Sequence, residues 1–181
     1  MPLVLPRFYA IIHRSLRPDL TLGHLAATLV DAGVTLIQLR VKQAPSRQFL
    51  AQTQELLSRL PAGVSMLVND RADVAWLAGA AGVHLGQQDL PVSLARSWLG
   101  HEKIIGISTH GMEQVEAADA ALADYVAFGP VFPTQTKAAA EPVVGVERLR
   151  EVRSRTAKPL VAIGGITPGN AAQVIEAGAD A

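Results

Sequence analysis

The chain of 181 residues contains no cysteine, which excludes disulfide bonds, thiolate nucleophiles and cysteine-ligated metal sites. It also lacks an excess of either charge, because 16 lysine and arginine residues balance 16 aspartate and glutamate residues. A neutral chain has no long-range attraction for nucleic acid or for an anionic membrane, so we expect neither as a partner. Cationic side chains that matter for function must therefore act locally, within a site.

Long apolar runs are also missing. No stretch approaches the ~18 apolar residues of a membrane span. Prolines interrupt the N-terminal segment, and no basic region precedes an apolar one as in a signal peptide. We therefore expect a cytoplasmic protein. The apolar content of 49 % still suffices for a large core, and the length suits one domain, so residues 1–181 are expected to form a single domain.

Short apolar runs alternate with segments of helical periodicity. Strands are predicted over residues 8–12, 34–39, 64–68, 82–85, 104–107, 125–128 and 160–163, and helices over 20–31, 46–60, 72–78, 92–99, 112–122, 146–153 and 168–177. Runs that are apolar throughout are typical of parallel strands buried on both faces. This alternation predicts an α/β fold, either an open doubly wound sheet or a (β/α)8 barrel. No Gly-x-Gly-x-x-Gly follows the first strand, which disfavours a dinucleotide-binding sheet.

A complete barrel has eight βα units, and this sequence supplies about seven. After Gly178 only Ala179, Asp180 and Ala181 remain, and they are typical of the first residues of another strand. We therefore expect a TIM (β/α)8 barrel whose closing strand and helix are missing from this chain.

Polar residues and glycines follow every predicted strand from the second to the seventh. The segments are Gln-Leu-Arg-Val-Lys at 38–42, Asn-Asp-Arg at 69–71, His-Leu-Gly-Gln-Gln-Asp at 84–89, Ser-Thr-His at 108–110, Gly-Pro-Val-Phe-Pro-Thr-Gln-Thr-Lys at 129–137 and Gly-Gly-Ile-Thr at 164–167. In a (β/α) barrel these strand ends meet on one face, where active sites lie. Six such segments in succession predict a site there.

Some of these residues also have a purely structural interpretation. Asp70 and Asp89 each precede a predicted helix and could cap it. Gln38, Arg40 and Lys42 alternate along an extended segment, so they can face the same way, either into a site or toward solvent. The two histidines of these segments lack zinc-site spacing, and we interpret the one at position 84 as a packed strand residue.

Other features favour a site for phosphate groups. The longest loop carries Thr134, Thr136 and Lys137, whose hydroxyls and ammonium suit phosphate oxygens. The glycine pair at 164–165 allows a close backbone approach to an anion before a helix. Carboxylates beside cations in a phosphate site usually indicate Mg²⁺. The sequence therefore predicts a site for a diphosphate and a second phosphate, with Mg²⁺ as cofactor.

The six segments, in this order, resemble those of the thiamine phosphate synthase family, from about residue 8 to the end of the chain. The resemblance implies a transferase with two small-molecule substrates. The family joins 4-amino-2-methyl-5-(diphosphooxymethyl)pyrimidine to a thiazole phosphate and releases diphosphate. The diphosphate leaves first, and the thiazole nitrogen then captures a pyrimidine methylene cation. Stabilising a departing diphosphate requires cations more than a general base.

The resemblance also implies a role for each matching residue. The pyrimidine diphosphate would be bound by Gln38, Arg40, Lys42, Asn69, Ser108 and Lys137, of which Arg40, Ser108 and Lys137 are the candidates for a catalytic role. Mg²⁺ would be bound by Asp70 and Asp89. The thiazole phosphate would contact Thr134, Thr136 and Gly165.

The sequence departs from the family pattern in two places. Ile12-His13 stands where the family usually has Thr-Asp, and the Val-Ser segment of an eighth strand, which completes the thiazole-phosphate site, is not present. Two other functions stay open. One is a thiazole tautomerase with the same barrel, although that branch tends to lose the Asn-Asp carboxylate and the Thr-x-Thr-Lys loop. The other is a pseudoenzyme that binds thiamine precursors without turnover.

Overall fold

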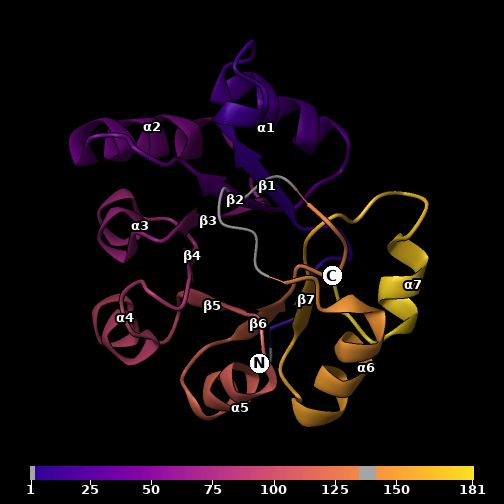
Figure 1. Cartoon of the computed structure of the whole chain (residues 1–181). Coiled ribbons are helices and arrows are strands. Elements are labelled where there is room, and N and C mark those ends of the chain that lie inside the picture. Colours follow the sequence, from indigo (N-terminus) through magenta and orange to yellow (C-terminus); the bar gives the residue numbers. More distant parts are fainter. Residues whose placement is uncertain (1–2, 135–141) are drawn as a thin grey trace. The chain divides into compact units, whose positions relative to one another are not determined.

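The computed structural model describes residues 3–134 and 142–181, in which strands and helices alternate throughout (Figure 1). The strands are β1 (Ala10–His13), β2 (Leu36–Arg40), β3 (Ser65–Asn69), β4 (Gly82–Leu85), β5 (Ile104–Thr109), β6 (Tyr125–Phe128) and β7 (Leu160–Ala162). The helices are α1 (Leu22–Asp31), α2 (Ser46–Arg59), α3 (Ala72–Ala78), α4 (Val92–Leu99), α5 (Met112–Ala120), α6 (Gly145–Arg155) and α7 (Ala171–Glu176), with a 3₁₀ turn η1 (Arg14–Leu16) after β1.

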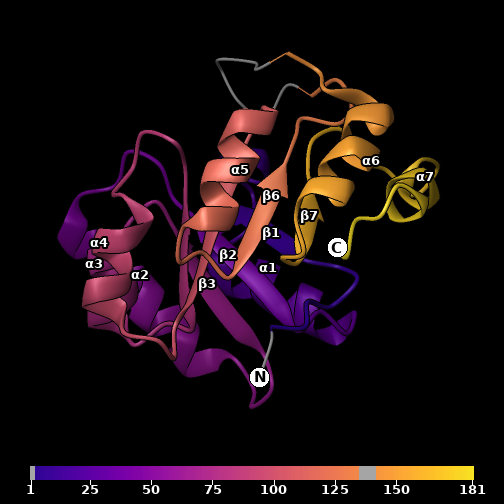
Figure 2. The same cartoon turned by 90° about the horizontal axis from the view of Figure 1, so that it is seen from below.

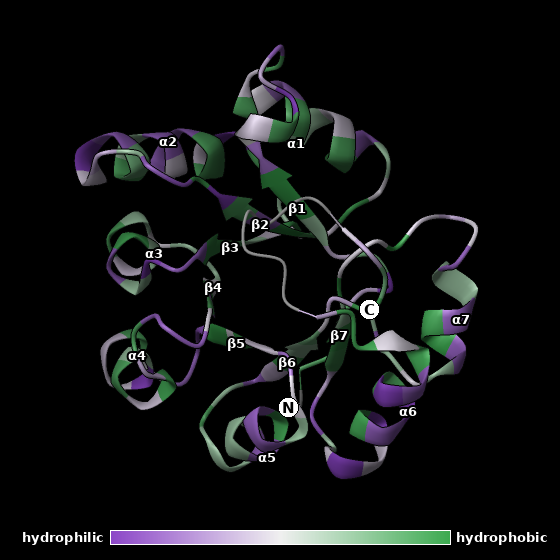
Figure 3. Ribbon diagram, in the orientation of Figure 1, coloured by the Kyte–Doolittle hydropathy of each residue, from purple (hydrophilic) through white to green (hydrophobic). Residues whose placement is uncertain are grey.

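The strand order in the sheet follows the chain from β1 to β7. The pairs β1–β2, β2–β3, β3–β4, β5–β6 and β6–β7 are all parallel. The strands are mostly apolar (Figure 3) and largely buried, as expected where helices cover a parallel sheet. This confirms the α/β prediction of seven βα units of a (β/α) barrel.

The chain divides into two compact units, one of residues 8–105 and the other of residues 1–7 and 106–181. We call them the β1–β4 unit and the β6–β7 unit. The prediction of a single domain stays a prediction. In the β1–β4 unit, helices α1 to α4 follow one another along one side of the strands (Figure 1). In the β6–β7 unit, α5 and α6 lie beside β6 and β7 (Figure 2).

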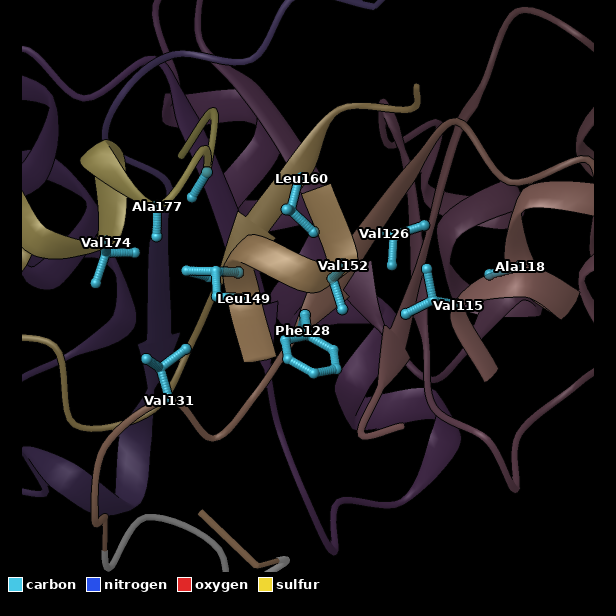
Figure 4. Packing of buried hydrophobic residues seen from close by; sticks show 12 residues of the cluster. Val115, Ala118, Val126, Phe128, Val131, Leu149, Val152, Leu160, Val174 and Ala177 are labelled. Atoms are coloured by element: carbon cyan, nitrogen blue, oxygen red, sulfur yellow. The ribbon is translucent and has the colours of Figure 1, made fainter. Parts of the chain in front are cut away.

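The core of the β6–β7 unit gathers apolar side chains from both strands and the helices that cover them (Figure 4). Phe128 of β6 and Leu160 of β7 are 1 % and 0 % exposed, and Leu149 and Val152 of α6 are fully buried. Burial of this kind stabilises the fold by roughly 25 cal/mol per Å² of apolar surface. This packing holds β6 and β7 in place beneath α6, and with them the residues that follow each strand.

Most predicted boundaries are within two residues of the observed ones, but α7 begins three residues later than predicted. The backbone N–H of Thr167 donates to Oδ1 of Asn170 (2.7 Å), and the N–H of Asn170 donates to the Thr167 carbonyl (3.1 Å). These two bonds close a turn over residues 167–170, so the helix begins only at Ala171. Pro168 therefore lies in this turn rather than in the first helical turn.

The last described residues continue along the edge of β7. The N–H of Asp180 donates to the Leu160 carbonyl (2.8 Å), and the N–H of Ala162 donates to the Ala181 carbonyl (2.9 Å). Residues 179–181 thus begin to pair with β7 in the way predicted for the start of a further strand.

Candidate functional site

Strand register places the basic residues of the β1–β4 unit at the carboxyl end of its sheet. Arg40 is the last residue of β2, where it pairs in register with His13 of β1. Gln38 lies two positions earlier and therefore faces the same way. It is 3 % exposed, and its Nε2 donates to the hydroxyl of Tyr9 (2.8 Å). Lys42 follows β2 and is half exposed. Both cations, Arg40 and Lys42, therefore come from the carboxyl end of β2.

Asp70 comes directly after β3, in an unusual backbone conformation. Its φ of 65° lies in the left-handed region, which non-glycine residues seldom adopt. Its N–H donates to the carbonyl of His84 in β4 (2.8 Å), and its carboxylate forms an ion pair with Lys42. The N-cap residue of α3 is Arg71, without a side-chain capping bond. Asp70 is therefore not the helix cap considered as its alternative role.

Asp89 is not a helix cap either, because α4 has Pro91 at its N-cap and no side-chain capping bond. Its Oδ2 instead accepts a hydrogen bond from the backbone N–H of Gly86 (2.6 Å). Burial raises the pKa of the Asp89 carboxyl above its usual range, and the neighbouring Asp70 carboxyl raises it further. Because the Asp70 carboxyl disfavours the charged form of Asp89, a cation bound beside Asp89 would favour that charged form.

The described residues include no group of three or more histidine, cysteine or acidic side chains that could hold a metal ion. Asp70 and Asp89 alone could supply two oxygen ligands, which is the number that Mg²⁺ commonly takes from a protein when substrate phosphates and water complete its shell. The pair therefore fits a phosphate-dependent Mg²⁺ site better than a metal site made of protein ligands alone.

Asn69, the last residue of β3, has a buried side-chain donor without a protein partner among the described residues. It is 7 % exposed, and in the described part of the chain its Nδ2 has no hydrogen-bond partner. Buried polar groups are normally paired, so an unpaired amide at a strand end calls for an explanation. A substrate oxygen could supply the acceptor. His84 is 6 % exposed within β4, as expected for a packed strand residue.

The β6–β7 unit holds the other described candidates. Ser108 lies in β5 and is partly buried, and Thr134 lies in the loop after β6. Gly165 follows β7. Thr136 and Lys137 lie outside the described residues. Each described candidate thus comes from the carboxyl end of a strand, and the structure describes them within two separate units.

Close packing explains the glycine pair after β7. Gly164 and Gly165 have φ values of 100° and 64°. A Cβ on Gly164 would lie 2.5 Å from Cβ of Pro130, and a Cβ on Gly165 would lie 2.5 Å from the carbonyl oxygen of Pro133. The N–H of Phe132 donates to the Gly164 carbonyl (2.9 Å). The absence of side chains at Gly164 and Gly165 therefore lets the loop after β6 pack directly against the end of β7.

A cavity of about 510 Å³ in the β6–β7 unit lies away from these strand ends. It is lined by Arg7, Arg153 and Asp180, together with apolar residues of the N-terminal segment and Pro159 just before β7. Because this is the amino end of the strand, the cavity is not part of the candidate site.

Comparisons with known proteins identify the family of the chain. The family described as "Thiamine monophosphate synthase" matches residues 8–181. The chain belongs to this family. A thiamine-phosphate synthase of Koribacter versatilis is 52 % identical over 98 % of this chain and 86 % of its own length. The solved thiamine phosphate pyrophosphorylase of Pyrococcus furiosus is 34 % identical, has a TM-score of 0.84, and aligns with 95 % of this chain and 81 % of its own.

More distant structures share only the fold. The phosphoribosyl anthranilate isomerase of Thermotoga maritima is 16 % identical with a TM-score of 0.67, over 93 % of this chain and 82 % of its own. The family comparison and the fold together confirm the predicted thiamine phosphate synthase resemblance and the transferase class. No helix in the described ranges is long and apolar enough to cross a membrane.

Sequence reasoning missed two participants. His13 was noted only as a departure from the family pattern, and Tyr9 was not considered. The strand register His13↔Arg40 brings the histidine to the candidate site, and only a correct pairing of β1 with β2 could have revealed this.

Proposed function

We propose that the protein condenses 4-amino-2-methyl-5-(diphosphooxymethyl)pyrimidine with a thiazole phosphate, forming thiamine phosphate and diphosphate. One observation carries the proposal: Lys42, Asp70, Asp89 and the unpaired amide of Asn69 lie together at the ends of β2 to β4. Cations, a carboxylate pair and a free donor are what a metal diphosphate requires. We also propose that the reaction takes place in the cytoplasm.

In this proposal the residues stabilise the departing diphosphate and do not transfer a proton. Arg40, Lys42 and Lys137 balance the charge of the diphosphate as its bond to the pyrimidine methylene breaks, and Asn69 donates to one of its oxygens. Asp70 and Asp89 would hold Mg²⁺, which when bound supplies charge stabilisation to the departing diphosphate. Because the thiazole nitrogen is itself the nucleophile, no general base is needed.

On the pyrimidine side we propose Gln38 with its partner Tyr9, and the family resemblance assigns Ser108 to the same substrate. The Gln38–Tyr9 bond holds the amide in place (2.8 Å), and Ser108 supplies a hydroxyl. On the thiazole side we propose that Thr134, Thr136 and Gly165 contact the second substrate, and that its phosphate lies against the backbone at Gly165. A backbone held by close glycine packing is a rigid support for an anion.

The test is diphosphate release with both substrates and Mg²⁺, using Asp70→Asn and the matched control Asp73→Asn. Asp73 is a neighbouring carboxylate that is paired with Arg71 (2.5 Å) and belongs to no metal pair. Asp70→Asn should lower kcat about 100-fold or more, with no recovery at high Mg²⁺, whereas Asp73→Asn should stay within about threefold of wild type. Near-normal turnover of Asp70→Asn across a Mg²⁺ titration would reject the assigned metal role.

The same assay separates a synthase from both alternatives, and isomerisation of the thiazole substrate then separates the two alternatives from each other. A tautomerase would isomerise a thiazole substrate without releasing diphosphate, and a pseudoenzyme would bind the substrates without product. The relatives that are 52 % and 34 % identical to this chain are named a synthase and a pyrophosphorylase, and the Asn69–Asp70 pair expected to be lost in tautomerases is present.

A further inference from the structure

His13 lies at the candidate site but has no part in the function proposed above. It is the last residue of β1, directly opposite Arg40 in the parallel register. Its Nε2 lies 2.8 Å from Nη1 of Arg40, and its Nδ1 lies 3.1 Å from Oγ of Ser15. The Ser15 Oγ also lies 3.3 Å from Nε2, so the hydroxyl faces both ring nitrogens, whereas the guanidinium contacts Nε2.

The direction of these hydrogen bonds fixes the protonation state of the ring. A guanidinium can only donate and does not lose its proton, so Nε2 must accept with its lone pair. The ring proton then lies on Nδ1, where it can be donated to Ser15. His13 must be neutral to hold Arg40 in this way. Protonation of Nε2 would remove the acceptor and place two cations side by side.

The surroundings favour the neutral ring. Burial lowers the pKa of His13 below its usual value, and the positive charges of Arg40 and Lys42 lower it further. Helix α1 also packs against β1, but its titratable residues His24 and Asp31 are not among the groups that shift the pKa. No described acidic group therefore acts on the ring to favour its protonated form.

We propose that neutral His13 is a positioning residue, which holds the Arg40 guanidinium toward the diphosphate and releases it when the imidazole takes up a proton. The proposal rests on the assignment of Arg40 to the pyrimidine diphosphate. It gives the enzyme an acid-sensitive affinity for this substrate. The affinity for the pyrimidine diphosphate is therefore highest at pH 8, where His13 is neutral, and falls as the pH drops through the lowered pKa of the ring.

Two variants separate positioning from packing. His13→Gln keeps a neutral side chain whose carbonyl can accept from Arg40, and His13→Leu removes the acceptor. At pH 8 we expect His13→Leu to raise KM for the pyrimidine diphosphate about tenfold, with kcat within about threefold of wild type, and His13→Gln to restore most of the affinity. An unchanged KM in His13→Leu would refute the positioning role.

The pH dependence is read from the ratio of kcat/KM in wild type to that in His13→Gln. Titration of the substrate and of the other site groups is common to both proteins and cancels in this ratio. We expect the ratio to fall about threefold to tenfold between pH 8 and pH 5. A ratio that stays constant over this range would overturn the acid-sensitive role, even if the positioning role survived.

Nuclear magnetic resonance of the imidazole gives a measurement that does not depend on turnover. In the ligand-free protein, the His13 ring should titrate below pH 6.5, and Arg40→Gln should move its pKa upward by removing an adjacent positive charge. If the enzyme releases no diphosphate at all, the proposed function fails, but this titration still decides whether the pair exists. An identical His13 pKa in wild type and Arg40→Gln would contradict the pair itself.

Discussion

At the scale of single residues, the β1–β4 unit keeps polar groups in states that are unfavourable without a ligand. Asp70 has a left-handed backbone, and Asn69 beside it has an unpaired buried amide nitrogen. Asp89 is a carboxyl whose raised pKa reflects burial and a like neighbour. Each feature costs free energy in the unbound protein. A bound metal diphosphate would relieve the last two, because it supplies acceptor oxygens and positive charge.

The unpaired amide leads to a prediction for Asn69→Leu. The leucine is close to the asparagine in size and removes a donor that has no partner, so we expect a melting temperature equal to or above that of wild type. The KM for the pyrimidine diphosphate should rise about tenfold, because the donor to a charged oxygen is lost. Calorimetry and steady-state kinetics measure the two quantities.

Asn170→Leu is the matched control for Asn69→Leu. Both amide atoms of Asn170 are used, by the Thr167 N–H (2.7 Å) and the Gly165 carbonyl (3.1 Å). Its loss should destabilise the protein by about 1–3 kcal/mol. If Asn69→Leu is destabilised as much as the control and its KM is unchanged, the amide is structural.

At the scale of elements, the sequence predicts the helices and strands well and their ends less well. The span Ala72–Ala78 agrees fully because Gly79, with a φ of 73°, ends it in the left-handed manner. The turn η1 and the late start of α7 were missed, since both depend on local hydrogen bonds that residue periodicity does not encode. The pairing of His13 with Arg40 was missed because it depends on strand register, a long-range property.

The glycine pair after β7 gives a prediction at the same scale. Gly165→Ala combines a left-handed backbone with a Cβ 2.5 Å from the Pro133 carbonyl oxygen, so it should lower the free energy of unfolding by about 2–4 kcal/mol. Gly33→Ala is the control, because Gly33 has a φ of 85° but no atom within 4 Å of its Cβ position. It should cost only about 1 kcal/mol.

Urea unfolding of the two alanine variants measures the difference between them. Equal losses in both would show that the contact with the loop after β6 adds nothing to the backbone strain. A larger loss in Gly165→Ala would show that the contact with Pro133 restricts the backbone at the end of β7.

At the scale of the whole molecule, family membership and the βα pattern reinforce each other. Six polar segments recur at successive strand ends, and a parallel sheet brings such ends to one edge. Residue type and order therefore predicted the family and the class of reaction. What the sequence could not provide is which polar atoms are already paired, since that depends on packing: Gln38 is bound to Tyr9, whereas Asn69 Nδ2 has no partner among the described residues.

Linkage between binding and folding tests the metal site without turnover. In the proposed site, Asp70 and Asp89 are the two metal ligands among the described residues, so Mg²⁺ alone should bind weakly and change the melting temperature little. Inorganic diphosphate alone should bind through Arg40 and Lys42. Together they should raise the melting temperature by more than the sum of the separate shifts, because each completes the binding site of the other.

At a free concentration of about 100 times Kd, the expected stabilisation is about 2.7 kcal/mol, or roughly 5–10 °C for a protein of this size. Asp70→Asn should keep the shift produced by diphosphate alone and lose the added effect of Mg²⁺, whereas Asp73→Asn should keep both. Replacing Mg²⁺ by Na⁺ at equal ionic strength controls for charge screening. If Mg²⁺ adds the same increment in Asp70→Asn as in wild type, then Asp70 does not bind the metal, and its ion pair with Lys42 is its only role.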